Sequence, residues 1–167
     1  EDMVNSCNSL KPVPGRLEFV GKTKKGALVY IDYAHTPDAL KHLLETLREL
    51  TKGDLVLVFG AGGDRDKDKR KLMGAIAYRY CDLIYVTDDN PRYEDAKSIR
   101  EQIIESCPVA IEIEDRAEAV TTAIQLARLD DVVIIAGKGH EQVQIVRDNY
   151  FPFSDFEQAS IAIELME

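Results

Sequence analysis

The stretch LVLVFGAGGDRDKDKRKLMGAIAYRY, residues 55–80, decides the fold class of this chain. It opens with a continuous apolar run that ends in glycine, which is typical of a strand buried on both faces of a sheet. A glycine-rich, charged loop follows. Residues 68–80 then fit a helix, for which we expect Leu72, Ala75 and Ile76 to face inward. A buried strand, a loop and a helix in this order make one unit of an α/β fold.

Apolar strands and amphipathic helices alternate along the rest of the chain in the same way. After Pro37, the segment 38–50 places a row of leucines on one helical face: Leu40, Leu43, Leu44, Leu47 and Leu50. Further helices are predicted at 95–106, 116–129 and 154–166, and strands at 17–20, 27–33, 82–88, 109–114, 132–137 and 142–146. This alternation predicts a mainly parallel sheet of about six strands with helices on both faces.

The length, net charge and apolar runs of the chain narrow the classes of protein to which it can belong. At 167 residues the chain fits a single domain with a sizeable core. Its net charge of −9 disfavours a nucleic-acid partner, because most of the surface would repel a phosphate backbone. No apolar run approaches the ~20 residues that span a bilayer, so no membrane partner is expected.

The cysteines, Cys7, Cys81 and Cys107, lie far apart in the sequence. They form no CxxC pair and have no histidine at ligand spacing, so neither a zinc site nor a disulfide framework is predicted. Thiols that stay reduced fit a cytoplasmic location.

The first residues read as a linker. This stretch contains the turn-forming residues Pro12, Pro14 and Gly15, and it lacks the basic-then-apolar pattern of a signal peptide. We therefore expect residues 1–11 to be the remnant of a linker and residues 12–167 to form one domain of a longer protein.

Four loops are expected at the carboxyl ends of the strands, where open parallel sheets bind their ligands. They are DYAHTPDAL (loop 1, residues 32–40), GAGGDRDKDKRK (loop 2, 60–71), TDDNPRYED (loop 3, 87–95) and AGKGHE (loop 4, 136–141). The functional residues of this chain are predicted within them.

Loops 1 and 2 each allow two interpretations. In loop 1, Asp32 could accept ribose hydroxyls beside a helix start that faces phosphate. Alternatively, Thr36 or Asp38 simply caps the helix, with Pro37 in its first turn. Loop 2 has three glycines in four residues, which let a ligand approach the backbone, and Arg65 is placed to reach into a pocket. It is neither a P-loop nor GxGxxG, so a flexible solvated turn remains the alternative.

Loop 3 carries most of the opposed charge. Pro91 stiffens the turn and aims Arg92, whose guanidinium can grip a carboxylate with two hydrogen bonds. Asp88 or Asp89 could hold an ammonium group. Alternatively, Asp95 caps the next helix and the rest of the loop faces solvent.

Loop 4 places two glycines around Lys138, followed by His140 and Glu141. It lacks the spacer and first glycine of a P-loop. A packed, hydrogen-bonded histidine is the simpler interpretation of His140 than a catalytic one. Together the loops predict a pocket with two guanidiniums and two carboxylates, which suits a zwitterion such as an amino acid rather than a nicotinamide.

The motifs PGRLE (14–18), DYAHTPDAL, FGAGGDRDKDKR, DDNPRYED and GKGHE, in this order, resemble the C-terminal domain of the Mur ligases over about residues 12–165. The resemblance implies a Rossmann-like three-layer α/β sandwich. Within that family the DNPR element is associated with the members that select meso-diaminopimelate rather than lysine. Ala96 and Asp68 depart from the family pattern, where proline and a small residue are common.

The resemblance also implies an ATP-dependent acid–amino-acid ligase of peptidoglycan precursor synthesis. In that reaction ATP phosphorylates the D-glutamyl γ-carboxylate of UDP-MurNAc-L-Ala-D-Glu, and an amine of meso-diaminopimelate attacks the acyl phosphate. ATP and Mg²⁺ are held mainly by a central domain whose P-loop, carbamylated lysine and magnesium residues this sequence lacks. We therefore expect no catalytic residue and no metal site here, and no activity from the chain alone.

By the same resemblance, Arg92 would clamp the distal carboxylate of diaminopimelate, and Asp89 and Glu141 its distal ammonium. Arg16 resembles an arginine that meets the ATP phosphates on domain closure, and Asp32 and His35 resemble residues near the ribose and adenine. The full set of implied diaminopimelate contacts is Arg65, Asp89, Asn90, Arg92, Gly137 and Glu141.

Two alternatives stay open. One is the corresponding domain of a folylpolyglutamate or cyanophycin synthetase, against which DNPR and GKGHE count. The other is a stand-alone domain that senses an amino acid or nucleotide, which a gene without an upstream P-loop would favour.

Overall fold

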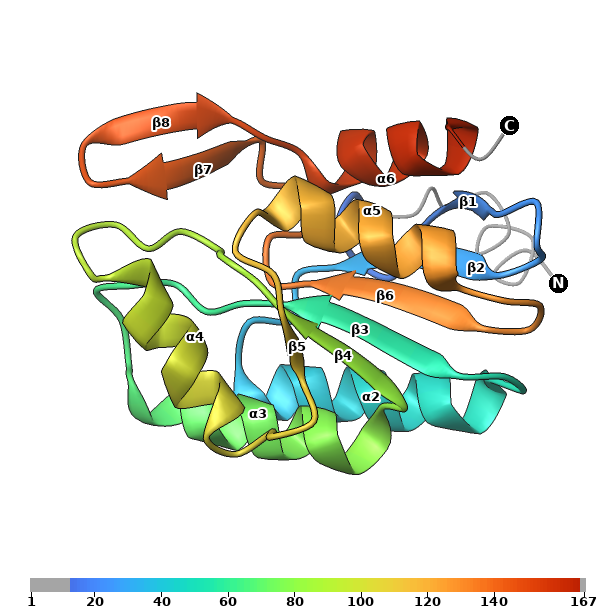
Figure 1. Cartoon of the computed structure of the whole chain (residues 1–167), viewed down its shortest axis with the longest axis horizontal. Helices are drawn as coiled ribbons and strands as arrows, with labels where there is room; N and C mark the ends of the chain where they lie inside the picture. The colour runs from blue at the N-terminus through green and yellow to red at the C-terminus, as the bar shows by residue number, and fades with distance from the viewer. Residues whose placement is uncertain (1–12, 166–167) are drawn as a thin grey trace, which may run out of the picture.

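The computed structural model describes residues 13–165 and shows three layers, with a central sheet between two sets of helices (Figure 1). The linker expected at residues 1–11 lies outside the described residues. Within the described part, six strands form the sheet in the order β1-β2-β6-β3-β4-β5. Their bounds are Glu18–Lys22 (β1), Leu28–Asp32 (β2), Leu55–Phe59 (β3), Leu83–Val86 (β4), Ile111–Glu112 (β5) and Val132–Ala136 (β6).

All neighbouring strands are parallel except β1, which pairs antiparallel with β2 at one edge. The α/β fold class predicted from the sequence is therefore confirmed, and so is the mainly parallel six-stranded sheet. Strand 142–146 exists as β7 (Val143–Val146), but it pairs with β8 (Asn149–Pro152) in a separate hairpin rather than joining the sheet.

Each face of the sheet carries its own core, because alternate side chains of a strand point to opposite faces. In β3, Leu55, Leu57 and Phe59 belong to one apolar cluster, and Val56 and Val58 belong to the other. The first cluster is covered by α2 (Pro37–Leu50), α3 (Asp68–Tyr80) and α4 (Ala96–Ile104), and the second by α5 (Arg116–Leu126) and α6 (Asp155–Glu164) (Figure 1).

The helices begin where short polar side chains cap them. Thr36 Oγ1 accepts a hydrogen bond from Ala39 N, and Asp95 caps α4 by accepting from Ser98 N. The capping interpretations of loops 1 and 3 are therefore correct for these two residues. Ser154 caps α6 in the same way.

Some residues expected to face inward do not. Leu50 is 73% exposed and Leu72 is 56% exposed, and Ala75 also lies on the surface. Leu50 is the last residue of α2, and the buried face of that helix is formed by Leu40, Leu44 and Leu47. Leu72 and Ala75 are exposed because α3 buries a different face, which includes Met73 and Gly74. The complete buried set of α3 is Arg70, Met73, Gly74 and Ala77.

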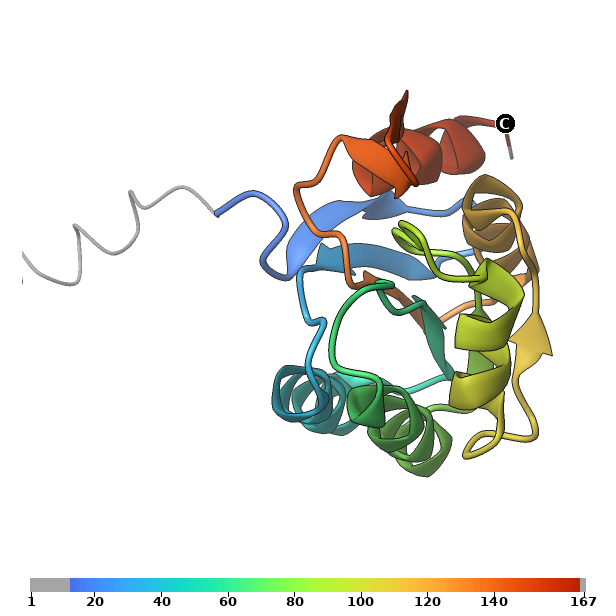
Figure 2. The ribbon, with the colours of Figure 1, turned by 90° about the vertical axis from the view of Figure 1, so that its left-hand side faces the viewer.

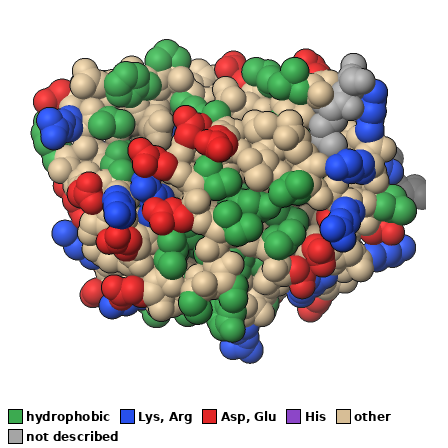
Figure 3. Space-filling model, in the orientation of Figure 1, with side chains coloured by type: hydrophobic (Ala, Val, Ile, Leu, Met, Phe, Trp, Pro, Cys, Tyr) green, Lys and Arg blue, Asp and Glu red, His purple; other side chains and the backbone are tan. Residues whose placement is uncertain are grey.

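No helix within residues 13–165 is long and apolar enough to span a bilayer. In the view of Figure 3, acidic and basic side chains lie mixed over the region of the surface that carries α4.

Candidate functional site

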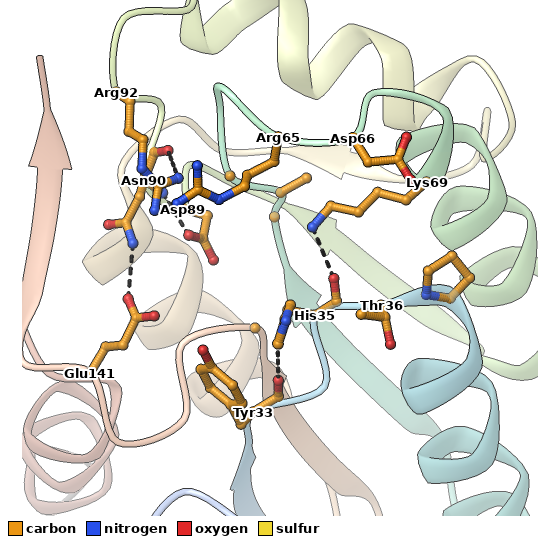
Figure 4. Close-up of a pocket in the computed structure, with 15 residues that line it drawn as sticks. Tyr33, His35, Thr36, Arg65, Asp66, Lys69, Asp89, Asn90, Arg92 and Glu141 are labelled. Atoms are coloured by element: carbon orange, nitrogen blue, oxygen red, sulfur yellow. Dashed lines mark hydrogen bonds between the residues drawn. The ribbon is translucent and has the colours of Figure 1, made fainter.

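The four loops lie together at the carboxyl ends of the strands (Figure 2). They line one cavity of about 480 Å³ (Figure 4). All six residues implied as diaminopimelate contacts line it, together with His35. The guanidiniums of Arg65 and Arg92 and the carboxylates of Asp89 and Glu141 thus share one cavity. The whole lining is Tyr33, His35, Thr36, Pro37, Gly60, Ala61, Gly62, Arg65, Asp66, Lys69, Asp89, Asn90, Arg92, Gly137 and Glu141.

Glycines let loop 2 pack directly on the backbone of loop 3. A Cβ at Gly63 would lie 1.9 Å from Pro91 O, and one at Gly60 would lie 2.3 Å from Thr87 O. No side chain fits such distances, so these positions require glycine. The glycine half of loop 2 is therefore a packed wall of the cavity, and the exposed residues of the loop are the charged residues 64–68 and Lys71.

Arg92 is held by backbone pairing as well as by Pro91. Its φ of +52° is uncommon for a residue other than glycine. Its N–H donates to Ile145 O at 3.1 Å, and its carbonyl accepts from Arg147 N at 2.8 Å, so the β7–β8 hairpin fixes the turn. The guanidinium Nη1 donates to Gly63 O at 2.9 Å, which joins loop 3 to loop 2.

Of the two adjacent carboxylates in loop 3, Asp89 faces the cavity. Its Oδ1 accepts from Asn90 N at 2.6 Å. Asp88 instead forms an ion pair with Arg100 outside the cavity. Burial raises the pKa of Asp88, and the hydrogen bond from Arg100 works against that increase. The residues of loop 3 alone left Asp88 and Asp89 open, and the family resemblance named Asp89. Of the two, Asp89 lines the cavity.

Asn90 is the centre of a polar network in the wall of the cavity. Its Nδ2 donates to Glu141 Oε2 at 2.9 Å, and its Oδ1 accepts from Ile145 N at 2.9 Å and from Lys138 Nζ at 2.7 Å. Lys138 is completely buried. Burial lowers its pKa, and the nearby charges of Asp89 and Glu141 oppose that effect. Sequence reasoning noted Lys138 only as the residue between two glycines.

The other end of the cavity is formed by loop 1 and the start of α3. Lys69 reaches across and donates from Nζ to His35 O at 3.0 Å (Figure 4). Burial lowers the pKa of Lys69, against the raising influence of Asp89 and Asp66. Lys69 and Asp66 were missed from the sequence, because a run of alternating charges does not indicate which members turn inward.

Two of the residues expected near ATP lie beside the cavity rather than in its wall. The Arg16 guanidinium stacks 4.8 Å from the centre of the Tyr33 ring, which itself lines the cavity. Asp32 accepts hydrogen bonds from Leu17 N at 2.7 Å and Ala34 N at 2.8 Å. It therefore also has a local role in fixing the chain around β2. Exposed His140 packs against Tyr33, with ring centres 5.5 Å apart.

Two buried arginines, neither singled out from the sequence, support the loops from behind. Arg70 is fully buried and pairs with Glu94 of loop 3 at 2.9 Å. Hydrogen bonding to Arg70 lowers the pKa of Glu94 to about 2, although burial opposes the shift. Arg116 pairs with Asp155 at 2.8 Å, with both side chains fully buried, and donates to Ala136 O at 3.0 Å beneath loop 4.

Within residues 13–165 no group of three or more His, Cys, Asp or Glu side chains is arranged to hold a metal ion. The carboxylates of the cavity are instead paired with cations and amides of the chain.

The family model and the curated relatives that match this chain indicate the same family. Residues 15–139 match the family described as Mur ligase, glutamate ligase domain. The UDP-N-acetylmuramoyl-L-alanyl-D-glutamate–2,6-diaminopimelate ligase of Agrobacterium fabrum is 52% identical over 98% of this chain, which covers 34% of that relative. The chain thus spans about a third of the length of the curated relatives it matches.

Solved structures agree with the sequence matches. A UDP-N-acetylmuramoyl-L-alanyl-D-glutamate–2,6-diaminopimelate ligase superposes with a TM-score of 0.85 at 36% identity, over 98% of this chain and 34% of that one. A bifunctional folylpolyglutamate synthase/dihydrofolate synthase, solved with Mn, AMPPNP and L-glutamate bound, gives a TM-score of 0.61 at 27% identity. That match covers 75% of this chain and 29% of the other.

Proposed function

The chain belongs to the Mur ligase family, through its glutamate ligase domain over residues 15–139, and from that premise we propose that its cavity binds meso-diaminopimelate for an ATP-dependent ligase. The observation that carries this proposal is the convergence of Arg65, Arg92, Asp89 and Glu141 on one cavity. Two cations and two anions complement an amino acid that carries both signs of charge at its far end.

The carboxylate and the ammonium at the distal end of diaminopimelate each have a partner among the cavity residues. Arg92 is the clamp for the distal carboxylate, since a guanidinium presents parallel donors to a carboxylate. Asp89 and Glu141 accept from the distal ammonium. Arg65, Asn90 and Gly137 complete the contacts, with Gly137 at φ +113° bringing the backbone close to Asp89.

In the proposed reaction, the D-glutamyl γ-carboxylate of UDP-MurNAc-L-Ala-D-Glu is first phosphorylated by ATP. The free amine of diaminopimelate attacks the acyl carbon of the acyl phosphate, and the amide bond forms. The C–O bond between the acyl carbon and the phosphate breaks, and phosphate leaves with the electron pair of that bond. A proton is lost from the attacking nitrogen. The role of the present residues is to bind and orient the amino acid, which lowers the entropic part of the barrier.

ATP and Mg²⁺ belong to the longer ligase. We propose that both are held mainly outside these 167 residues, with Arg16, Asp32 and His35 approaching the nucleotide when the domains close. Because ATP is an intracellular cosubstrate, a cytoplasmic location is part of the proposal.

Ligand titration tests the amino-acid site directly. Addition of meso-diaminopimelate to the chain should shift the amide resonances of the cavity residues, and lysine should do so more weakly because it lacks the distal carboxylate. A preference for lysine would contradict the proposal. L-glutamate distinguishes the folylpolyglutamate-type alternative, because its far end has a carboxylate but no ammonium for Asp89 and Glu141.

Activity tests the same site in the longer enzyme. In a ligase that carries this domain, Arg92→Ala should raise the KM for diaminopimelate by roughly 10- to 100-fold, as expected for a charge-assisted hydrogen bond of ~1.5–3 kcal/mol. The KM for ATP should change little. An unchanged KM for diaminopimelate would remove Arg92 from the site. The 167-residue chain alone should form no amide from ATP, and detectable ligation by it would contradict the division of roles proposed here.

A further inference from the structure

Lys138 is a completely buried cation directly below the proposed amino-acid site, and the function proposed so far assigns it no role. Its Nζ donates to Asn90 Oδ1 at 2.7 Å and lies 3.4 Å from Glu141 Oε2. Burying an ammonium group is costly unless its partners compensate. An apolar side chain would avoid this cost, so the charge itself points to a role at this position.

The first consequence of Lys138 concerns the side-chain amide of Asn90. Its oxygen accepts from Lys138 Nζ and Ile145 N, while its NH₂ group donates to Glu141. Rotating the amide by half a turn would bring the NH₂ group against two donors and its oxygen against a carboxylate. Lys138 therefore acts together with Ile145 N and Glu141 to hold Asn90 in one orientation.

The second consequence concerns Glu141. The hydrogen bonds from Asn90 and Lys138 both reach Oε2. Figure 4 shows Glu141 beside Asn90 at the edge of the cavity, with its second carboxylate oxygen turned away from this contact. Oε1 is thereby left for a ligand. The charges of Asp89, Glu141 and Lys138 sum to one negative charge, which matches a single ligand ammonium.

We propose that Lys138 is a positioning residue that makes the site selective for an ammonium group at the far end of the bound amino acid. It acts through Asn90 and Glu141 and does not itself contact the ligand. This inference rests on the proposed function, which supplies the amino acid.

Selectivity between two ligands is the test. 2-Aminopimelate keeps both carboxylates of meso-diaminopimelate and one amine but lacks the second amine. The unaltered chain should bind meso-diaminopimelate roughly 10- to 100-fold more tightly than 2-aminopimelate, as measured by amide shifts in NMR titrations. In Lys138→Met this ratio should fall to about twofold or less, because Glu141 is no longer held for the ammonium.

A purely structural role for Lys138 predicts something else. The affinities for both ligands would then fall by the same factor. The ratio of the two affinities would be unchanged, which would overturn the inference. A ratio that rises would also overturn it, because Lys138 would then act only as a charge that repels the ligand. If Lys138→Met does not fold, Lys138→Gln keeps a donor near Asn90 but removes the charge beside Glu141, so a smaller fall in the ratio is expected, and an unchanged ratio would overturn the inference.

The matched control is Lys71→Met, which removes an exposed lysine that is paired with Glu105 at 2.6 Å and does not line the cavity. Its ratio should equal that of the unaltered chain. If the unaltered chain itself shows no preference for meso-diaminopimelate over 2-aminopimelate, the ammonium contact in the proposed function fails. In that case the NH₂ resonances of Asn90 decide the positioning role: a shift in Lys138→Met but not in Lys71→Met supports it, and unchanged resonances overturn it.

Discussion

Replacing Glu94 with glutamine removes one charge from the ion pair that joins loop 2 to loop 3. Glu94 accepts from Arg70 Nη1 at 3.0 Å and Nη2 at 2.9 Å, and from Asp64 N at 2.6 Å. Breaking a buried ion pair costs about 3–5 kcal/mol, because the remaining charge stays buried. Glu94 is 16% exposed and glutamine keeps one acceptor oxygen, so we expect the free energy of unfolding to fall by about 2–3 kcal/mol at pH 7.

The loss should depend on pH in a defined direction. The hydrogen bond from Arg70 lowers the pKa of Glu94 from 4.5 to about 2. A lowered carboxyl pKa contributes stability that is fully present above pH 4.5 and is lost as the pH falls through about 2. Lowering this pKa from 4.5 to about 2 corresponds to at most about 3.4 kcal/mol of stability, and solvent screening reduces this to about 2 kcal/mol. The difference in the free energy of unfolding between the unaltered chain and Glu94→Gln should therefore shrink by roughly half between about pH 7 and pH 3.

Urea unfolding followed by circular dichroism at several pH values measures this difference, provided that the m-values agree. Glu105→Gln is the matched control, since Glu105 and its partner Lys71 are 56% and 60% exposed. Its effect should stay below about 0.5 kcal/mol. The reasoning is refuted if Glu94→Gln is as stable as the unaltered chain at neutral pH, or if the gap between them is the same in acid.

Three further outcomes follow from the packing of the site and core. Gly63→Ala would place a methyl group 1.9 Å from Pro91 O, so we expect a loss of at least about 2 kcal/mol in urea unfolding; an unaffected midpoint would show that the loops separate easily. Asp155→Asn leaves fully buried Arg116 without its counter-ion and should cost about 3–5 kcal/mol by the same assay, whereas a loss below about 1 kcal/mol would mean that Arg116 finds another partner. Burial raises the pKa of Cys107, so iodoacetamide at mildly alkaline pH should modify this thiol only in the unfolded chain; rapid labelling in native buffer, detected by mass spectrometry, would contradict its burial.

The order of strands and helices could be read from the sequence because each sheet strand is a short apolar run bounded by turn residues. The run LVLVF became β3, and VVIIA became β6, with every residue buried. The exposed strand β8 was missed because its residues, all exposed, carry no pattern of burial. The inward face of α3 was predicted wrongly because its buried set includes a charged residue, Arg70, which a search for apolar side chains passes over.

The sequence by itself determined the fold class and the loops that carry the site. Both depend on local patterns: the periods of apolar residues, the caps and glycines, and the rule that ligands bind at the carboxyl ends of parallel strands. Which charges meet depends on how the loops pack in the folded chain. The tertiary structure separated Asp88 from Asp89, turned Lys69 into the cavity and placed Lys138 beneath it. The physical reason is that the partner of a charge lies on another loop, and its distance follows from packing rather than from position in the chain.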